Sequence, residues 1–224
     1  MAASGTTTFS LDLTEIIEEA YARCGVEVRS GWEFRTARTS LNLMFADWAS
    51  RGVNLWTIDS STVAMVASTA TYALPADTID IFEAVLRTNS GETSQTDLPL
   101  ARISAPVYAS LPNKLTEGRP LQMWVQRLAT PQITLWPVPD SATYTLVYWR
   151  LRRIQDAGNG VNTMDVPFRF VPCMVAGLAY HLAMKVPNGL ERVDILKAQY
   201  DQAWEMAAAE DRDRASVRFV PRIV

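Results

Sequence analysis

Apolar residues recur at helical spacing over the first part of the chain. After Ser10, which is placed to act as an N-cap, they recur every three or four positions up to a stop at Gly25: Leu13, Ile16, Ile17, Ala20, Tyr21 and Cys24. Ser30 and Glu33 then have the spacing of a capping box. A second apolar stripe follows and ends near Gly52: Phe34, Ala37, Leu41, Met44, Phe45 and Trp48. The pattern predicts two consecutive helices that pack on each other.

Helical spacing returns after Pro167. One apolar stripe consists of Val171, Met174, Val175, Leu178 and Leu182. A second stripe, for which Asn188 is the expected cap, consists of Val193, Leu196, Tyr200, Ala203, Trp204 and Ala207. We expect this last helix to run to about Arg214. Its end, residues 210–214, is charged and has lost the apolar stripe, so it is predicted to be solvated or to project from the body.

Between Val53 and Val166 the spacing changes to short β-prone runs. These runs are Leu55 to Ile58, Thr62 to Ala67, Ile79 to Leu86, Leu121 to Gln126, Gln132 to Trp136 and Tyr144 to Trp149. Eight of the chain's 12 prolines lie between residues 75 and 139, and turn-prone clusters occur at 89–91 and 158–160. A small antiparallel sheet or sandwich with long loops is predicted, interrupted by one short helix at 103–110.

The fold class that these patterns predict is α+β. The N- and C-terminal helices form a bundle, and an antiparallel β region is inserted between them. Residues 1–52 and 167–214 are the two parts of the helical domain, residues 53–166 are the inserted β region, and residues 215–224 form an extended C-terminal tail.

The charge balance of the chain argues against one class of function, nucleic-acid binding. The chain carries 21 Lys and Arg residues against 24 Asp and Glu residues, a net charge of -3, which disfavours a protein that grips nucleic acid through its phosphates. Only 3 of the basic residues are lysines, leaving 21 minus 3, or 18, arginines. Arginine suits paired contacts across protein interfaces, and a GC-rich genome gives the same bias.

Neither export nor a membrane span is expected. The N-terminus lacks a basic start followed by an apolar stretch. The longest apolar run, residues 171–186, is interrupted by Pro172, His181 and Lys185.

Residue types that carry catalysis are scarce. His181 is the only histidine, and its place beside Leu178 and Leu182 favours a hydrogen-bonded core or boundary residue over a catalytic base. Cys24 and Cys173 lie in helix-like patterns and are expected to be buried free thiols. No Cys-x-x-Cys pair, Gly-x-Ser-x-Gly elbow or phosphate-binding glycine loop occurs in the sequence. We therefore expect no enzymatic activity, no metal and no cofactor.

Acidic and aromatic residues leave alternatives open. Glu15, Glu18 and Glu19 cluster on the first helix, and Asp77 and Asp80 lie close together. A solvated helix face and a turn explain them better than the paired carboxylates of a glycosidase. The 7 tryptophans would suit a sugar-binding platform, but most lie at positions expected in a core or a subunit interface. The alternative function is therefore a non-catalytic carbohydrate- or receptor-binding tail module.

Four stretches, taken in order, carry a resemblance to a known family. They are Phe34 to Trp56 (FRTARTSLNLMFADWASRGVNLW), Tyr72 to Asp80 (YALPADTID), Ile133 to Trp149 (ITLWPVPDSATYTLVYW), and Phe168 to Lys185 with the long last helix. Together they resemble the head-to-tail adaptor family of short-tailed phages, which includes the tail tubular protein A and tail accessory factor types. The resemblance covers nearly the whole chain and is carried by diffuse patterns rather than by one motif.

The resemblance implies a structural ring of the virion, usually dodecameric to match the portal, that continues the DNA channel at the portal-tail junction. The implied partners are the portal protein, the tail nozzle protein and neighbouring copies of the chain. Duplex DNA would pass through without sequence-specific binding, and no membrane contact is implied. Such a protein is made in the host cytoplasm. No catalytic residues carry over from the family.

Mapped onto this sequence, the resemblance implies two contact regions. The C-terminal tail is expected to dock on the portal or on a neighbouring subunit through Val217, Arg218, Phe219, Val220, Pro221, Arg222, Ile223 and Val224. The candidate nozzle-facing loop comprises Asn89, Ser90, Gly91, Glu92, Thr93 and Asp97. Phe219 is the largest candidate anchor of the tail. The alternative is that the tail folds back onto its own helices.

Overall fold

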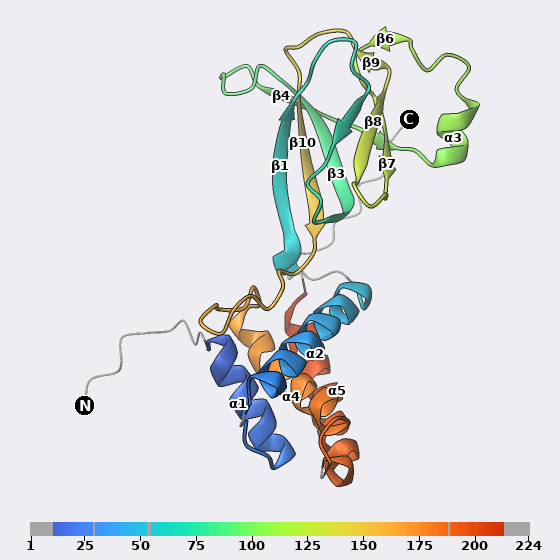
Figure 1. Ribbon diagram of the computed structural model, residues 1–224. Coiled ribbons are helices and arrows are strands. Elements are labelled where there is room, and N and C mark those ends of the chain that lie inside the picture. Colours follow the sequence, from blue (N-terminus) through green and yellow to red (C-terminus); the bar gives the residue numbers. More distant parts are fainter. Residues whose placement is uncertain (1–10, 29, 53–54, 188, 213–224) are drawn as a thin grey trace. The chain divides into compact units, whose positions relative to one another are not determined.

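The computed structural model describes residues 11–28, 30–52, 55–187 and 189–212. The chain divides into two compact units, one made of residues up to Trp56 and from Ile154 onward, the other of Thr57–Arg153 (Figure 1). Helices dominate the first unit and mainly antiparallel sheets the second. This mixture is that of the predicted α+β class.

Four longer helices make up most of the helical unit. They are α1 (Leu13–Cys24), α2 (Gly31–Ser50), α4 (Val171–Ala183) and α5 (Val193–Glu210). Short 3-10 turns occur at η1 (Leu55–Thr57), η2 (Phe168–Phe170) and η3 (Leu190–Arg192). Each helix lies where the apolar spacing predicts it.

Helix ends follow the predictions only in part. Ser30 and Glu33 form the expected capping box of α2, and Gly25 ends α1 with a left-handed φ of 80° that suits glycine. The cap of α1 is Asp12 rather than Ser10, because its carboxylate accepts from the Glu15 backbone N–H. Likewise α5 begins after a 3-10 turn with Arg192 as its N-cap, and ends at Glu210, before the predicted Arg214.

The core of the helical unit is built around α4. This helix packs against α1, α2 and α5, and nine of its residues are buried: Cys173, Met174, Val175, Ala176, Gly177, Leu178, Ala179, Leu182 and Ala183. The fully buried Trp48 of α2 donates from Nε1 to the Tyr200 hydroxyl of α5 at 2.8 Å. Gly177 lets these helices approach closely, since a Cβ there would lie 2.5 Å from Met44 Sδ and 2.7 Å from Tyr200 Cε2.

The segment after residue 153 belongs to the helical unit and not to the β region, where the sequence pattern had placed it up to residue 166. Ala157 is fully buried in the helical core, and its backbone N–H donates to Asn42 Oδ1 at 2.8 Å. Leu13 N–H donates to the Asn162 carbonyl at 3.1 Å. These contacts join residues distant in sequence, so local periodicity does not reveal them.

Two four-stranded sheets form the β unit. The first has the order β1 (Ile58–Ala64), β10 (Thr145–Arg152), β3 (Thr78–Thr88), β4 (Thr96–Pro99), with every neighbouring pair antiparallel. The second has the order β2 (Thr71–Ala73), β8 (Gln132–Trp136), β7 (Gln122–Gln126), β5 (Ala101–Arg102).

Smaller elements complete this unit. The pairings of β5 with β7 and of β6 (Glu117–Gly118) with β9 (Val138–Pro139) are parallel, unlike the antiparallel pairing predicted for the whole region. The short helix α3 (Ala105–Ser110) lies within the range predicted for it. Residues 55–57 form a 3-10 turn rather than the start of a strand.

The two sheets share one core. Ile81, Leu86, Leu146 and Tyr148 of the first sheet pack in the same cluster as residues of the second: Tyr72, Met123, Val125, Ile133 and Leu135. In β7 the buried residues Met123 and Val125 are two apart, which places both side chains on the inner face of the strand.

Candidate functional site

Arg150 occupies the least exposed position of any described arginine in the β unit's first sheet. It lies on β10 in register with Asp59 of β1, and its side chain is only 9% exposed. A guanidinium at such a position must find acceptors, because burying an unpaired charge is costly. Three residues supply them, and we call this set of Asp59, Asp77, Thr78 and Arg150 the arginine clamp.

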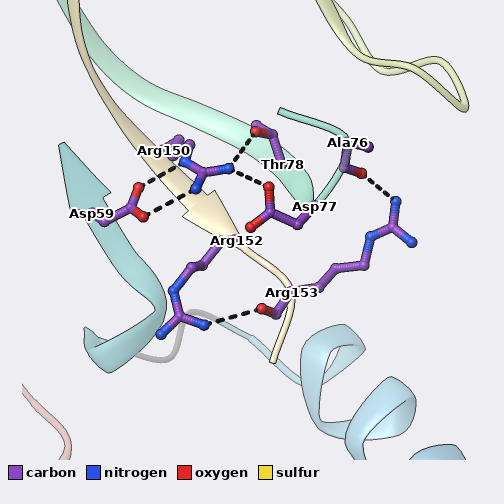
Figure 2. Close-up of polar contacts among 7 residues, drawn as sticks. All are labelled: Asp59, Ala76, Asp77, Thr78, Arg150, Arg152 and Arg153. Atoms are coloured by element: carbon purple, nitrogen blue, oxygen red, sulfur yellow. Dashed lines mark hydrogen bonds and ion pairs between the residues drawn. The ribbon is translucent and has the colours of Figure 1, made fainter. Parts of the chain in front are cut away.

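The clamp joins three segments of the β unit. Figure 2 shows Arg150 between Asp59 of β1 and the start of β3. Arg150 Nε and Nη2 donate to the two carboxylate oxygens of Asp59 at 2.7 and 3.1 Å. Arg150 Nη1 donates to Asp77 Oδ1 at 2.5 Å and to Thr78 Oγ1 at 2.9 Å. The guanidinium therefore holds together the end of the sheet from which the chain leaves β10.

Charge stabilises the clamp in its ionised form. The hydrogen bond from Arg150 lowers the pKa of Asp77, against the opposing effect of partial burial. Burial tends to lower the pKa of Arg150, but its bonds to Asp77 and Asp59 outweigh this and raise it. A carboxylate held ionised in this way is poorly suited to donate a proton to a glycosidic oxygen.

Neighbouring backbone contacts extend the clamp. Arg153 Nη2 donates to the Ala76 carbonyl at 2.7 Å (Figure 2). The Arg153 backbone N–H donates to the Asp77 carbonyl at 2.8 Å. Asp80, the other carboxylate considered as half of a glycosidase pair, accepts from Arg102 Nη2 at 2.8 Å. Asp77 and Asp80 thus serve different arginines, and their contacts are those of structural ion pairs.

A second buried ion pair lies in the helical unit. Asp211, the residue directly after α5, has a side chain only 3% exposed and pairs with Arg169 of η2. The same carboxylate accepts from the Leu55 backbone N–H at 2.9 Å. This contact anchors the end of α5 to the segment through which the chain leaves the helical unit.

His181 and the cysteines lie in the helical core or at its boundary. The His181 ring is 5.2 Å from the ring of Tyr180 and 6.4 Å from that of Tyr200, and burial lowers its pKa. Burial raises the pKa of Cys24 to about 11 and that of Cys173 to about 12, and neither forms a disulfide. Thiols with such values are poor nucleophiles near neutral pH.

The predicted nozzle-facing loop is an exposed hairpin connection between β3 and β4. Asn89 and Gly91 both have positive φ, 52° and 87°, which fixes the reversal of the chain. Arg87 and Asp97 close its base through two hydrogen bonds of 2.8 Å. Residues 89–95 are all exposed, so the loop offers its side chains to solvent. The other predicted contact region, residues 217–224, lies outside the described residues.

Most tryptophans are engaged inside their own unit. Trp48 lies in the helical core, where Trp56 and Trp204 pack against the same cluster. In the β unit, Trp124 stacks on Tyr108, and Trp136 Nε1 donates to the backbone carbonyl of Asn113, in the loop between α3 and β6. Trp32 differs, since it is 67% exposed. Trp48, Trp56, Trp124, Trp136 and Trp204 therefore make contacts within their own unit, which favours packing over a sugar-binding platform.

Three open hollows on the helical unit are lined by few titratable side chains. The one on α1 has a volume of about 570 Å³ and is lined by Glu18, Ala22, Gly25, Val26, Glu27 and Val28. Within the described ranges, no group of three or more His, Cys, Asp or Glu residues is placed to hold a metal ion. No helix in these ranges has the length and apolar character needed to cross a membrane.

The clamp is the feature that sequence reasoning missed. The available signal was Arg150 itself, a charged residue within the apolar and aromatic run of residues 146–151. Its carboxylate partner Asp59 lies 91 residues earlier, and no local pattern connects the two.

The comparisons with known proteins give one family. The family model of the SU10 adaptor protein matches residues 11–222, which span both compact units. No curated protein matches the sequence.

Proposed function

We propose that this protein is the head-to-tail adaptor of a short-tailed phage virion. The chain belongs to the SU10 adaptor protein family of phage structural proteins. In this role, copies of the chain form a ring, dodecameric to match the portal, between the portal and the tail nozzle. The observation that carries the proposal is the family match over residues 11–222.

The two-unit architecture supports a protein that joins two partners. Each unit has its own hydrophobic core, so each can present a stable surface. We assign the helices, as a bundle, to the portal and the neighbouring subunits, and the β unit to the tail. The resemblance to the tail tubular protein A and tail accessory factor types supports this assignment.

Two segments are the proposed contacts. Residues 217–224 dock on the portal or a neighbouring subunit, with Phe219 as the anchor, because alternating apolar side chains can enter pockets when an extended segment orders on binding. The hairpin loop at 89–97 faces the nozzle. Its closure by the Arg87–Asp97 pair supports a preformed contact, which loses less conformational entropy on binding.

The overall charge suits a channel that DNA must pass through. Each phosphate that a protein neutralises adds salt-dependent affinity and slows passage. A net charge of -3 avoids a general attraction to the duplex. The proposed ring therefore surrounds DNA without reading its sequence.

Sedimentation with and without the portal protein of the same virus tests the proposal. We expect small species for the chain alone and ring-sized complexes after portal is added, since a portal template raises the local subunit concentration. Electron microscopy of the mixture then gives the ring symmetry. A chain that stays small with portal, or that closes into rings of another symmetry without it, contradicts this function.

Deleting residues 216–224 tests the tail. The docking role predicts an unchanged melting temperature together with loss of assembly on the portal. A large fall in the stability of the monomer would instead indicate that the tail folds back onto its own helices. Unchanged portal binding would show that the tail has no docking role.

A further inference from the structure

Strand β1 is a free edge of the first sheet. It pairs with β10 over seven residues, Ile58 to Ala64, in unbroken register, and none of the strands in the described residues pairs with its other side. Natural proteins usually protect such an edge with proline, lysine or a bulge. Residues 58–64 (IDSSTVA) contain no proline or lysine, and the edge has no bulge.

The hydrogen-bonding phase of β1 shows which backbone groups are free. Met65 N–H donates to the Tyr144 carbonyl of the adjoining segment. In an antiparallel ladder alternate residues turn both backbone groups toward the partner, so Val63, Ser61 and Asp59 face β10. The intervening Ser60, Thr62 and Ala64 are exposed and turn their N–H and C=O groups away. They offer a strand-addition edge.

The opposite edge of the same sheet is closed to pairing. Leu100 N–H donates to the Ala84 carbonyl, which places Leu98 and Thr96 toward β3 and leaves Asp97 and Pro99 facing outward. Pro99 has no N–H to donate. A second copy therefore does not extend the sheet well through its β4, which leaves other extended segments as candidate partners of β1.

Side chains along β1 leave room for such a segment. On the face away from the core, Ser60 and Thr62 stand beside Trp149 and Val147 of β10. Trp149 is only partly buried. Because the β1 side chains there are small, a large apolar side chain on an added strand can lie across them toward the Trp149 ring.

We propose that this edge binds residues 216–220 of a second copy as an added strand, an inference that rests on the proposed ring. Val217 and Phe219 alternate with Arg218, as a strand with one apolar face requires. Pro221 follows directly and ends the added strand, because it has no N–H to donate to a ladder. Residues 213–215 connect Arg212 to this strand and span at most roughly 14 Å when extended, so the edge that binds it must lie within that reach of the end of α5 in the second copy.

The first ten residues fit the edge less well. They contain Gly5 and a single aromatic residue, Phe9, and lack the alternation of large apolar side chains seen at Val217 and Phe219. They nevertheless provide a useful competitor, since Thr6, Thr7 and Thr8 favour extended backbone.

Peptide binding to a chain that lacks residues 216–224 tests the inference without portal. The peptide 213–224 carries a fluorophore, and anisotropy gives its Kd. Thr62→Pro removes one outward N–H but no bond to β10, while Thr62→Val keeps that N–H and the side-chain shape. We expect Thr62→Val to bind as the parent does and Thr62→Pro to weaken binding on the order of tenfold or more. Equal melting temperatures of the two variants establish that the sheet is intact.

Each other outcome overturns the inference. Equal binding by Thr62→Pro and Thr62→Val shows that the edge is not the site. Binding of the peptide 1–10 in preference to 213–224 shows that the occupant is wrong. If Thr62→Pro unfolds, Ser60→Pro replaces it with the same expectation, and unaffected binding there counts equally against the edge. Portal binding by the full chain is measured separately, so failure of the strand addition leaves the adaptor role standing.

Discussion

Replacing Asp59 by Asn should destabilise the β unit far more than replacing Asp97 by Asn. Both carboxylates accept two hydrogen bonds from one arginine. The Arg87 side chain is 24% exposed and serves Asp97 in this contact, whereas that of Arg150 is 9% exposed and bridges three segments. The two substitutions therefore compare the loss of the same kind of carboxylate–arginine pair at a buried and at an exposed arginine.

The magnitudes follow from burial. Removing one partner of a buried guanidinium leaves part of its charge unpaired, and since Asp59 itself is 39% exposed, we expect a loss of about 1–3 kcal/mol in unfolding free energy. Asp97→Asn should cost clearly less, because solvent screens an exposed pair. Urea unfolding gives the totals, and hydrogen exchange of β10 peptides assigns the loss to this unit. Equal losses for the two variants would refute the reasoning.

Acid should weaken the same clamp. The pKa of Asp77 in the folded protein lies below its ordinary value of 3.8, so its contribution is complete above that value and is lost as the pH falls through the lower folded pKa. Arg150→Met removes the cause of the shift and should flatten this part of the stability curve. The measurement is the unfolding free energy of both proteins from pH 6 down to about pH 2. Parallel curves would show that Arg150 does not set the pKa.

Two further outcomes concern the helical core. Gly177→Ala should lower the unfolding free energy by about 1–3 kcal/mol in urea denaturation, because its Cβ would meet Met44 and Tyr200 within the closest packing of α4. Cys24 and Cys173 should react with a thiol reagent at pH 8 only after urea is added, since burial raises both pKa values; rapid labelling of the native protein would contradict this.

Helices were predictable from the sequence because their information is local. The stripe of α2 and its Ser30–Glu33 capping box lie within one short stretch of chain. The start of α5 was missed because the 3-10 turn η3 precedes it, and a three-residue period over so short a span leaves no signal. Strands β2 and β5, at three and two residues, are likewise too short to show alternation.

The site was predictable only in outline. Asp77 was noticed as a carboxylate near Asp80, but its role depends on Arg150, which is 73 residues away in sequence. The segment from 154 to 166 was assigned to the β region because it lacks helical spacing. Its membership of the helical unit comes from nonlocal contacts such as the one between Ala157 and Asn42. Periodicity describes what a segment forms, and these contacts decide where it packs.

Buried charge in this protein anchors the chain where it passes from one unit to the other. On the helical side, Asp211 binds the Leu55 backbone and Arg169, just before the chain enters β1. On the β side, Arg150 binds Asp59 at the start of β1, and Arg153 binds the Ala76 carbonyl just after β10 ends. Each anchor is satisfied within its own unit, so neither unit needs the other to pair its charges. For the proposed adaptor role, this independence means that each unit has its own means of keeping its fold when it binds a partner.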